Sequence, residues 1–244
     1  KDKKYINNSS SVLDIGSNDG TFLNSLKCDI LCGADPTAYK FKDHYKKNIY
    51  IINNFFSKKN IENFFLKRKP NINSFDLITS FAMFYDVDEP NSFCKDIFSL
   101  LKSNGVWMLE LSYLPLMLKN LTYDQICHEH ISYYTLNVFK KIAEKNKLKI
   151  VDVGLNEING GSIEIVCARV ESKIKAKHGK IRKLLNDERK INLNSFKNFN
   201  KRINYTKKSI INFINKNSDK EIIGYGASTK GNVVLNHCKI NNIQ

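Results

Sequence analysis

The sequence predicts an α/β fold in which a mostly parallel sheet is flanked by helices. Short apolar runs alternate with helical stretches up to residue 111, a glycine turn follows the first run, and a polar turn separates two later runs. Right-handed crossovers place the carboxyl ends of parallel strands along one edge of a sheet, where ligands bind.

Each expected strand is a short apolar run bounded by turn residues. In chain order the strands are Val12–Ile15, Ile30–Ala34, Ile49–Ile52, Phe75–Ser80, Val106–Leu111, Lys149–Gly154 and Ser162–Arg169. Helices are expected between the first five strands at Thr21–Lys27, Tyr39–Lys46, Asn60–Arg68 and Ser92–Lys102. A polar turn at 156–161 joins the last two strands.

The last third of the chain has a different character. Residues 171–220 are polar and charged with a thin apolar stripe, which predicts a connector of one or two long helices. A strand at Glu221–Gly224, a glycine turn and a helix start then predict the opening of a second α/β unit over 221–244, after a first domain over 1–170. One strand and one helix cannot bury a core. We therefore expect either a fragment of a longer protein or a unit packed onto the first domain.

Composition narrows the class of protein. The 42% hydrophobic content favours a globular core, and no apolar run reaches the length of a membrane span. No signal-peptide pattern is present, and six scattered cysteines favour reduced thiols and the cytoplasm. The net charge of +15 suggests nucleic-acid binding. However, lysine is spread along a chain rich in Asn and Ile, so we disfavour that partner.

The turn after the first strand reads Asp14-Ile15-Gly16-Ser17-Asn18-Asp19-Gly20. Its glycines let the backbone approach a ligand closely. About 20 residues further on, Asp35 ends the second strand, where a carboxylate can accept hydrogen bonds from ribose hydroxyls. The form D-x-G-x-x-x-G is similar to the turn with which class I methyltransferases hold S-adenosylmethionine (SAM), the expected cofactor. The contacts expected from this region are Asp14, Gly16, Ser17, Asn18, Gly20 and Asp35.

Further cofactor contacts are expected at the ends of the third and fourth strands. Phe55 can stack on the adenine ring, although a core position is an equal alternative, and Asn54 can hydrogen-bond the adenine edge. Ser80 and Phe81 are expected to line the cofactor pocket.

The segment after the fifth strand carries the candidate chemistry. It reads Cys127-His128-Glu129-His130 within a stretch rich in phenols. A histidine beside a glutamate can act as a general base near neutral pH, and His130 is favoured over His128 for this role. Glu129 can orient the ring or bind a substrate hydroxyl. Structural histidines are one alternative, and metal ligands are a second that lacks a third ligand cluster.

Four blocks occur in order: Asp14–Gly20, His128–Tyr134, Asn159–Ser162 and Gly224–Gly231. Together they make nearly the whole chain resemble the SAM-dependent sugar C-methyltransferases, which methylate C3 of dTDP-4-keto-deoxysugars. The resemblance implies a class I methyltransferase fold, in which the last two strands form an antiparallel hairpin. It also implies a nucleotide-sugar substrate and a role in deoxysugar or polysaccharide biosynthesis. The family's N-terminal zinc-binding domain has no counterpart here, so no metal is expected, and only the opening of the C-terminal domain is matched. The sequence leaves the oligomeric state open, and a homodimer is one of the alternatives.

The resemblance implies that His130 removes the proton from C3 and that Glu129 contacts the sugar. This sequence departs from the family at Cys127, where a Tyr is usual, and over Ser80–Asp86, where an Asn and a His are usual. These departures leave O-methylation of a sugar or another small molecule open. The substrate contacts that we expect are Cys127, Tyr85, Asp86, Tyr133 and, for a phosphate, Lys230.

Two further alternatives remain. An RNA or DNA methyltransferase would fit the charge, but the fourth strand lacks the Asn/Asp-Pro-Pro-Tyr/Phe pattern of amino-directed base methylases. A non-catalytic SAM-binding module would bind the cofactor without turnover.

Overall fold

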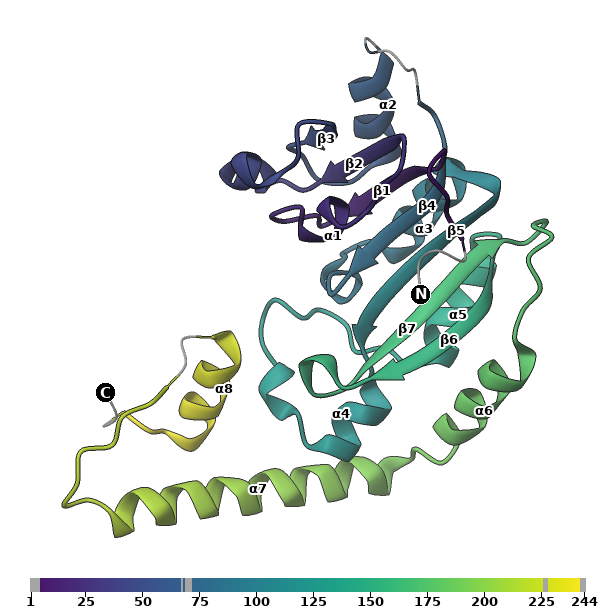
Figure 1. Ribbon diagram of the computed structural model, residues 1–244. Helices are drawn as coiled ribbons and strands as arrows, with labels where there is room; N and C mark the ends of the chain where they lie inside the picture. The colour runs from purple at the N-terminus through teal and green to yellow at the C-terminus, as the bar shows by residue number, and fades with distance from the viewer. Residues whose placement is uncertain (1–4, 67, 69–71, 226–227, 242–244) are drawn as a thin grey trace.

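The computed structural model describes residues 5–66, 68, 72–225 and 228–241 (Figure 1). Lys67, in the predicted helix Asn60–Arg68, and Gly226 and Ala227, in the last sequence block, lie outside the described residues.

The described residues form one sheet of seven strands in the order β3-β2-β1-β4-β5-β7-β6 (Figure 1). The strands are β1 Ser11–Ile15, β2 Ile30–Ala34, β3 Ile49–Ile52, β4 Phe75–Phe81, β5 Leu101–Ser112, β6 Leu148–Asn156 and β7 Ser162–Arg169. Strands β1 to β5 pair in parallel, and β7 pairs antiparallel with β5 and β6. The predicted fold class is confirmed. The strand order reverses between β1 and β4, which is where ligands bind in open α/β sheets.

The helices are α1 Thr21–Asn24, α2 Lys58–Leu66, α3 Pro90–Leu100, α4 Leu114–Asn120, α5 Leu136–Lys145, α6 His178–Glu188, α7 Leu193–Lys216 and α8 Thr229–Cys238. The predicted helix Thr21–Lys27 was too long, because the chain leaves the helix at Ser25, whose hydroxyl donates to the Phe22 carbonyl at 2.6 Å. The predicted helix Tyr39–Lys46 is a 3-10 helix at Ala38–His44.

The two faces of the sheet have separate cores. Helices α2, α3, α5 and α6 cover one face, where Trp107 is fully buried and packs edge-on against Phe84 with ring centroids 5.6 Å apart. Leu23 of α1 and Tyr45 belong to the core on the other face. Because Phe84 lies three residues after the end of β4, the first core fixes the start of the loop that borders the candidate site.

The predicted connector contains α6 and α7. Phe199 and Ile203 of α7 pack against Met117 and Leu118 of α4. Helix α8 lies beside the loop after α4 (Figure 1), with the rings of His237 and Tyr123 5.6 Å apart. The C-terminal helix therefore packs onto the first domain.

The strand predicted at Glu221–Gly224 was wrong. Residues 221–225 have no regular secondary structure, and no described strand runs beside them. A strand depends on hydrogen bonds to a neighbouring strand. The apolar residues Ile222 and Ile223 alone therefore do not form one. Among the described residues, no helix combines the length and hydropathy needed to span a bilayer.

Candidate active site

The loop between β1 and α1 adopts positive φ angles, which glycine allows. Gly16 and Gly20 have φ values of 73° and 75°, and Asn18 between them has 46°. The Gly16 N–H donates to the Ala34 carbonyl at 2.9 Å and so ties the turn to the end of β2. A Cβ at Gly20 would lie 2.7 Å from the ring of Tyr45. Gly20 is therefore required by the packing of Tyr45.

The side chain of Ser17 is directed away from the expected ligand. It is buried, and its Oγ lies 2.9 Å from the Tyr45 hydroxyl oxygen. That hydroxyl donates to the Asn18 carbonyl at 2.7 Å. The Ser17 side chain therefore shapes the turn, and a cofactor contact of Ser17 stays a prediction.

Asp14 is a buried carboxyl directly below the turn. It is 4% exposed, and the Thr79 hydroxyl donates to its Oδ1 at 2.6 Å. Burial raises the pKa of Asp14 to about 7, the nearby Asp35 charge adds to the increase, and the Thr79 hydrogen bond opposes it. Asp14 supports the turn from inside the protein.

Asp35 lies at the carboxyl end of β2, as predicted. The N–H and the hydroxyl of Thr37 donate to its Oδ1 at 2.6 and 2.7 Å, and the Asn18 N–H donates to Oδ2 at 3.1 Å. A carboxylate offers about four acceptor positions, so this arrangement leaves about one for a ribose hydroxyl.

A cavity of about 580 Å³ opens at this edge of the sheet. Gly16, Phe55, Phe56 and Met83 are among its lining residues, and Asp86 contributes a carboxylate. Its other lining residues are Ile15, Ala34, Pro36, Ser57, Val87, Asp88, Glu89, Ser92, Phe93 and Asp96. The Phe55 side chain is 72% exposed and free to stack on a planar ligand. The volume suits a ligand of cofactor size.

Three other predicted cofactor residues do not line this cavity. Ser80 is fully buried and accepts a hydrogen bond from the Trp107 indole at 2.9 Å, because it faces the core side of β4. Phe81 packs edge-on against Phe22, with centroids 5.2 Å apart. The Asn54 Oδ1 accepts the N–H of its neighbour Phe55 at 2.8 Å. The cofactor contacts expected of Ser80, Phe81 and Asn54 stay predictions.

The loop that carries the candidate base is closed at its two ends. Tyr113 pairs with Tyr134, and the Leu114 N–H donates to the Tyr134 carbonyl at 3.0 Å. Buried Glu188 accepts the Tyr113 hydroxyl at 2.7 Å and also the Leu136 N–H. These contacts hold the loop at the carboxyl end of β5.

A smaller cavity, of about 350 Å³, lies between this loop and α8. It is lined by Cys127, Glu129, His130, Asn159, Ser228, Thr229 and Lys230. Four residues predicted from separate parts of the sequence therefore come together. Asn159, Ser228 and Thr229 were missed as site residues, although the Asn159-Gly160-Gly161 block was a visible signal.

His130 is a half-buried imidazole in this cavity. Its ring packs against that of Tyr85 at an interplanar angle of 51°, with centroids 4.3 Å apart. Burial lowers the pKa of His130 below its usual value and the Lys230 charge lowers it further, while hydrogen bonding to the Gln125 carbonyl and the Glu129 charge act in the opposite direction. The imidazole is therefore neutral, and able to accept a proton, at pH 7.

The other two predicted side chains of this segment do not line the cavity. His128 is 89% exposed, with its Nδ1 3.6 Å from a Glu129 carboxylate oxygen, and its catalytic role stays a prediction. The Tyr133 hydroxyl donates to the Gln125 carbonyl at 3.2 Å and is occupied within the loop. Among the described residues no group of three or more His, Cys, Asp or Glu converges as metal ligands would.

Two consecutive residues connect the cavities. Asp86 lines the larger cavity, and Tyr85 contacts His130. Loss of solvent around the Asp86 carboxyl raises its pKa to about 6, and the Glu129 charge adds to the increase. The two cavities are therefore electrostatically linked.

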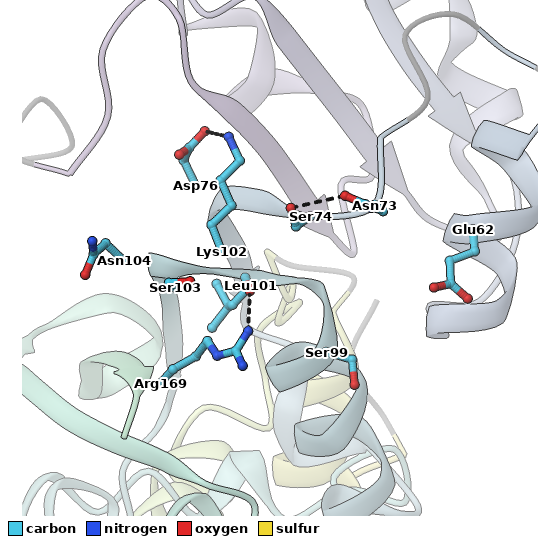
Figure 2. Close-up of a pocket in the computed structure, with 10 residues that line it drawn as sticks. All are labelled: Glu62, Asn73, Ser74, Asp76, Ser99, Leu101, Lys102, Ser103, Asn104 and Arg169. Atoms are coloured by element: carbon cyan, nitrogen blue, oxygen red, sulfur yellow. Dashed lines mark hydrogen bonds and ion pairs between the residues drawn. The ribbon is translucent and has the colours of Figure 1, made fainter. Parts of the chain in front are cut away.

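A larger hollow, of about 740 Å³, lies at the opposite edge of the sheet (Figure 2). Its charged groups already have partners within the protein. Lys102 pairs with Asp76 at 2.7 Å, and Arg169 donates to the Leu101 carbonyl at 3.1 Å. This hollow lies at the amino ends of the parallel strands, away from the glycine turn. We therefore assign the site to the opposite edge.

A sequence profile described as a methyltransferase domain matches residues 3–153, which is more than half of the chain. The chain belongs to this methyltransferase-domain family. A second profile, described as the C-methyltransferase C-terminal domain, matches residues 157–244 of the methyltransferase. S-adenosylmethionine is the methyl donor that this family implies.

Known proteins similar to this methyltransferase agree on the fold. The C-methyltransferase NovU of Streptomyces niveus is 29% identical over 146 residues, which cover 57% of this chain and 34% of NovU. The chain thus spans about a third of that relative's length. A chain from the complex of the Haloferax volcanii Trm112 methyltransferase activator with a putative methyltransferase superposes with a TM-score of 0.53 at 11% identity, covering 67% of this chain and 83% of that one. A putative SAM-dependent methyltransferase from Listeria monocytogenes superposes with a TM-score of 0.50 at 13% identity, covering 68% and 95%.

Proposed function

We propose that this methyltransferase transfers a methyl group from SAM to C3 of a nucleotide-linked 4-keto-deoxysugar, with His130 as general base. The observation that carries the proposal is the small cavity, in which His130, Glu129 and Lys230 converge beside the larger one. The similarity to NovU and the match to the C-methyltransferase C-terminal domain support C-methylation.

The residues around the larger cavity fit SAM. Gly16 is exposed on the cavity wall, Asp35 retains an acceptor position, and Phe55 offers an exposed ring. Carboxylates such as Asp86 suit a ligand of positive charge. When bound, SAM supplies an electrophilic methyl group on a positively charged sulfur.

Neutral His130 can take the proton from C3 of the sugar. The C4 ketone makes that proton acidic, because the electron pair left on C3 is delocalised onto the ketone oxygen as an enolate. The proton ends on His130, and C3 is the atom that accepts the methyl group. Glu129 stabilises the protonated ring by charge, and Lys230 pairs with a phosphate of the nucleotide.

O-methylation is the second candidate, and Asp86 favours it. A carboxyl with a pKa of about 6 beside the methyl-donor cavity can accept a proton from a sugar hydroxyl. His130 would act as base in either reaction, so His130 alone does not distinguish them.

The test is mass spectrometry of the full-length protein with SAM and dTDP-4-keto-deoxysugars in heavy water. A methyl mass gain with deuterium uptake into unreacted sugar, both lost in His130→Ala, supports C-methylation. The matched control is His128→Ala, which changes a solvent-facing histidine two residues away and should retain activity. Methyl gain without deuterium uptake supports O-methylation, and binding of SAM without any turnover contradicts both.

A further inference from the structure

We propose that Asn159, at the tip of the β6–β7 hairpin, is a substrate-binding residue. Its side-chain amide holds Lys230 in place and donates, beside that cation, to a negatively charged oxygen of the substrate. This role rests on the proposed function and deepens it, because it assigns the hairpin tip a direct contact with the substrate.

The hairpin turn that carries Asn159 is held by its main chain. The three consecutive carbonyls of residues 159–161 accept hydrogen bonds from Gln125 Nε2 at 2.8 Å, from Asn120 Nδ2 at 2.7 Å and from the Tyr113 N–H at 3.3 Å. All three contacts go to main-chain oxygens of the turn. The turn therefore keeps its place without any contribution from the Asn159 side chain.

The backbone at residue 159 would also accept glycine. Asn159 has a φ of 53°, in the left-handed region that glycine adopts at least cost, and the next two residues are glycines. Asn is one of the few other residues that enter this region readily. A side chain is thus present where neither the backbone nor the contacts of the turn require one, which indicates a use outside the turn.

The Asn159 side chain meets Lys230 in the small cavity. Both residues line the cavity, and the Lys230 Nζ donates to the Asn159 Oδ1 at 3.3 Å. This contact fixes the orientation of the amide, because an ammonium group only donates and must face the oxygen and not the nitrogen. The two N–H bonds of Nδ2 have no hydrogen-bond partner among the residues that the structure describes, so they are open to a ligand.

The positive charge of Lys230 is not cancelled by this contact. In the part of the chain that the structure describes, Asn159 is the one hydrogen-bond acceptor for Lys230, and an amide carries no charge. Lys102 shows the contrast, because it pairs with the carboxylate of Asp76 at 2.7 Å (Figure 2). A cation beside two open N–H donors suits a negatively charged oxygen, with which both groups make charge-assisted hydrogen bonds.

The proposed substrate offers two such oxygens. One belongs to a phosphate of the nucleotide and is negative from the moment of binding. The other is the C4 oxygen, which becomes negative only when the base takes the proton from C3. His130 lines the same cavity as Asn159, so the donors and the base act on the same part of the substrate. Because the two oxygens carry charge at different stages, binding and turnover distinguish them.

The test compares Asn159→Asp and Asn159→Gly with the wild type, since both replacements tolerate the left-handed backbone. Asn159→Asp retains an acceptor for Lys230 but cancels its charge and removes the N–H donors. Asn159→Gly removes the whole side chain. If Asn159 only held Lys230, Asn159→Asp would be the milder change. We expect the opposite, with a loss of about 10- to 100-fold in Asn159→Asp and a smaller one in Asn159→Gly.

Two measurements assign the oxygen. Isothermal titration calorimetry gives the Kd for dTDP, and the initial rate at saturating 4-keto-deoxysugar gives kcat. A weaker Kd identifies the phosphate, and a lower kcat at an unchanged Kd identifies the C4 oxygen. The matched control is Asn232→Asp, which adds the same charge at an exposed position of α8 that does not line the cavity. It should change either value by less than about threefold.

Wild-type values of both Kd and kcat in Asn159→Asp, or an equal loss in Asn232→Asp, overturn the inference. A wild type that methylates no sugar contradicts the proposed function separately, and the Kd for dTDP then decides the role of Asn159. A Kd weakened in Asn159→Asp and not in Asn232→Asp supports that role. An unchanged Kd, or no binding of dTDP to the wild type, overturns it.

Discussion

Replacing Asp14 by Asn should change how the stability of the protein depends on pH. Asp14 is buried and its carboxyl has a pKa of about 7 in the folded protein, against 3.8 for an exposed Asp. The folded state therefore keeps a proton that the unfolded state releases at a lower pH. By linkage, this group contributes stability that is present below about pH 4 and is lost as the pH rises to about 7.

The size of the effect follows from the shift. About three pKa units at 1.36 kcal/mol each give about 4 kcal/mol, of which about 3 kcal/mol is lost between pH 5 and pH 8. Asn cannot titrate and can still accept the Thr79 hydrogen bond. The free energy of unfolding of Asp14→Asn, minus that of the wild type, should therefore increase by about 3 kcal/mol over this range.

Urea unfolding followed by circular dichroism at pH 5, 6, 7 and 8 measures this difference. Asp76→Asn is the control. Although partial burial opposes it, hydrogen bonds from Lys102 and Ser11 hold the pKa of Asp76 below its usual value. Its difference from the wild type should stay constant over the range. A constant difference for Asp14→Asn as well would refute the reasoning.

Three further outcomes are expected. Gly20→Ala should lower the free energy of unfolding by about 1–3 kcal/mol, measured in urea, because its Cβ would meet the Tyr45 ring at a positive φ. Lys230→Met should raise the pKa of His130 in an NMR titration, because a nearby positive charge is removed, whereas Lys230→Arg should keep it low. Glu188→Ala should cost about 2–4 kcal/mol in the same urea assay, because it leaves buried donors without their acceptor.

Two results would contradict these expectations. A Cβ added at Gly179, in α6, would meet no atom of the described residues within 4 Å, so Gly179→Ala should stabilise the protein slightly. An equal loss in Gly179→Ala and Gly20→Ala would show that Tyr45 is not the cause. An unchanged His130 titration in Lys230→Met would remove the electrostatic link across the small cavity.

The sequence was most informative where an element is defined locally. The bounds of Ile30–Ala34, Ile49–Ile52 and Ser162–Arg169 were predicted as the structure has them, because each is an apolar run between turn residues. The predicted strand at Glu221–Gly224 failed because pairing depends on a distant partner, which no local pattern reports.

For the candidate site, the sequence indicated which residue types are present better than it indicated where their side chains point. Ser80 ends a strand at the correct edge, but its side chain faces Trp107, because the face of a strand on which a residue lies depends on the register of the whole sheet. Asn159 was missed as a lining residue, because it reaches the small cavity only where a distant hairpin packs against the loop. The Gly16 turn and His130 could be named as candidates because each belongs to a motif that is contiguous in the chain.

Helix α7 fixes the orientation of α8, which carries Lys230, relative to α4. Arg202 on α7 donates to the Leu118 and Lys119 carbonyls of α4, both at 3.0 Å, while Lys207 donates to the His237 carbonyl of α8 at 2.6 Å. One residue inserted between Arg202 and Lys207 would turn everything beyond it by about 100° and advance it by about 1.5 Å. The cation on α8 would then no longer face the base, although neither residue had changed. The length of this helix therefore sets where Lys230 lies relative to the candidate base.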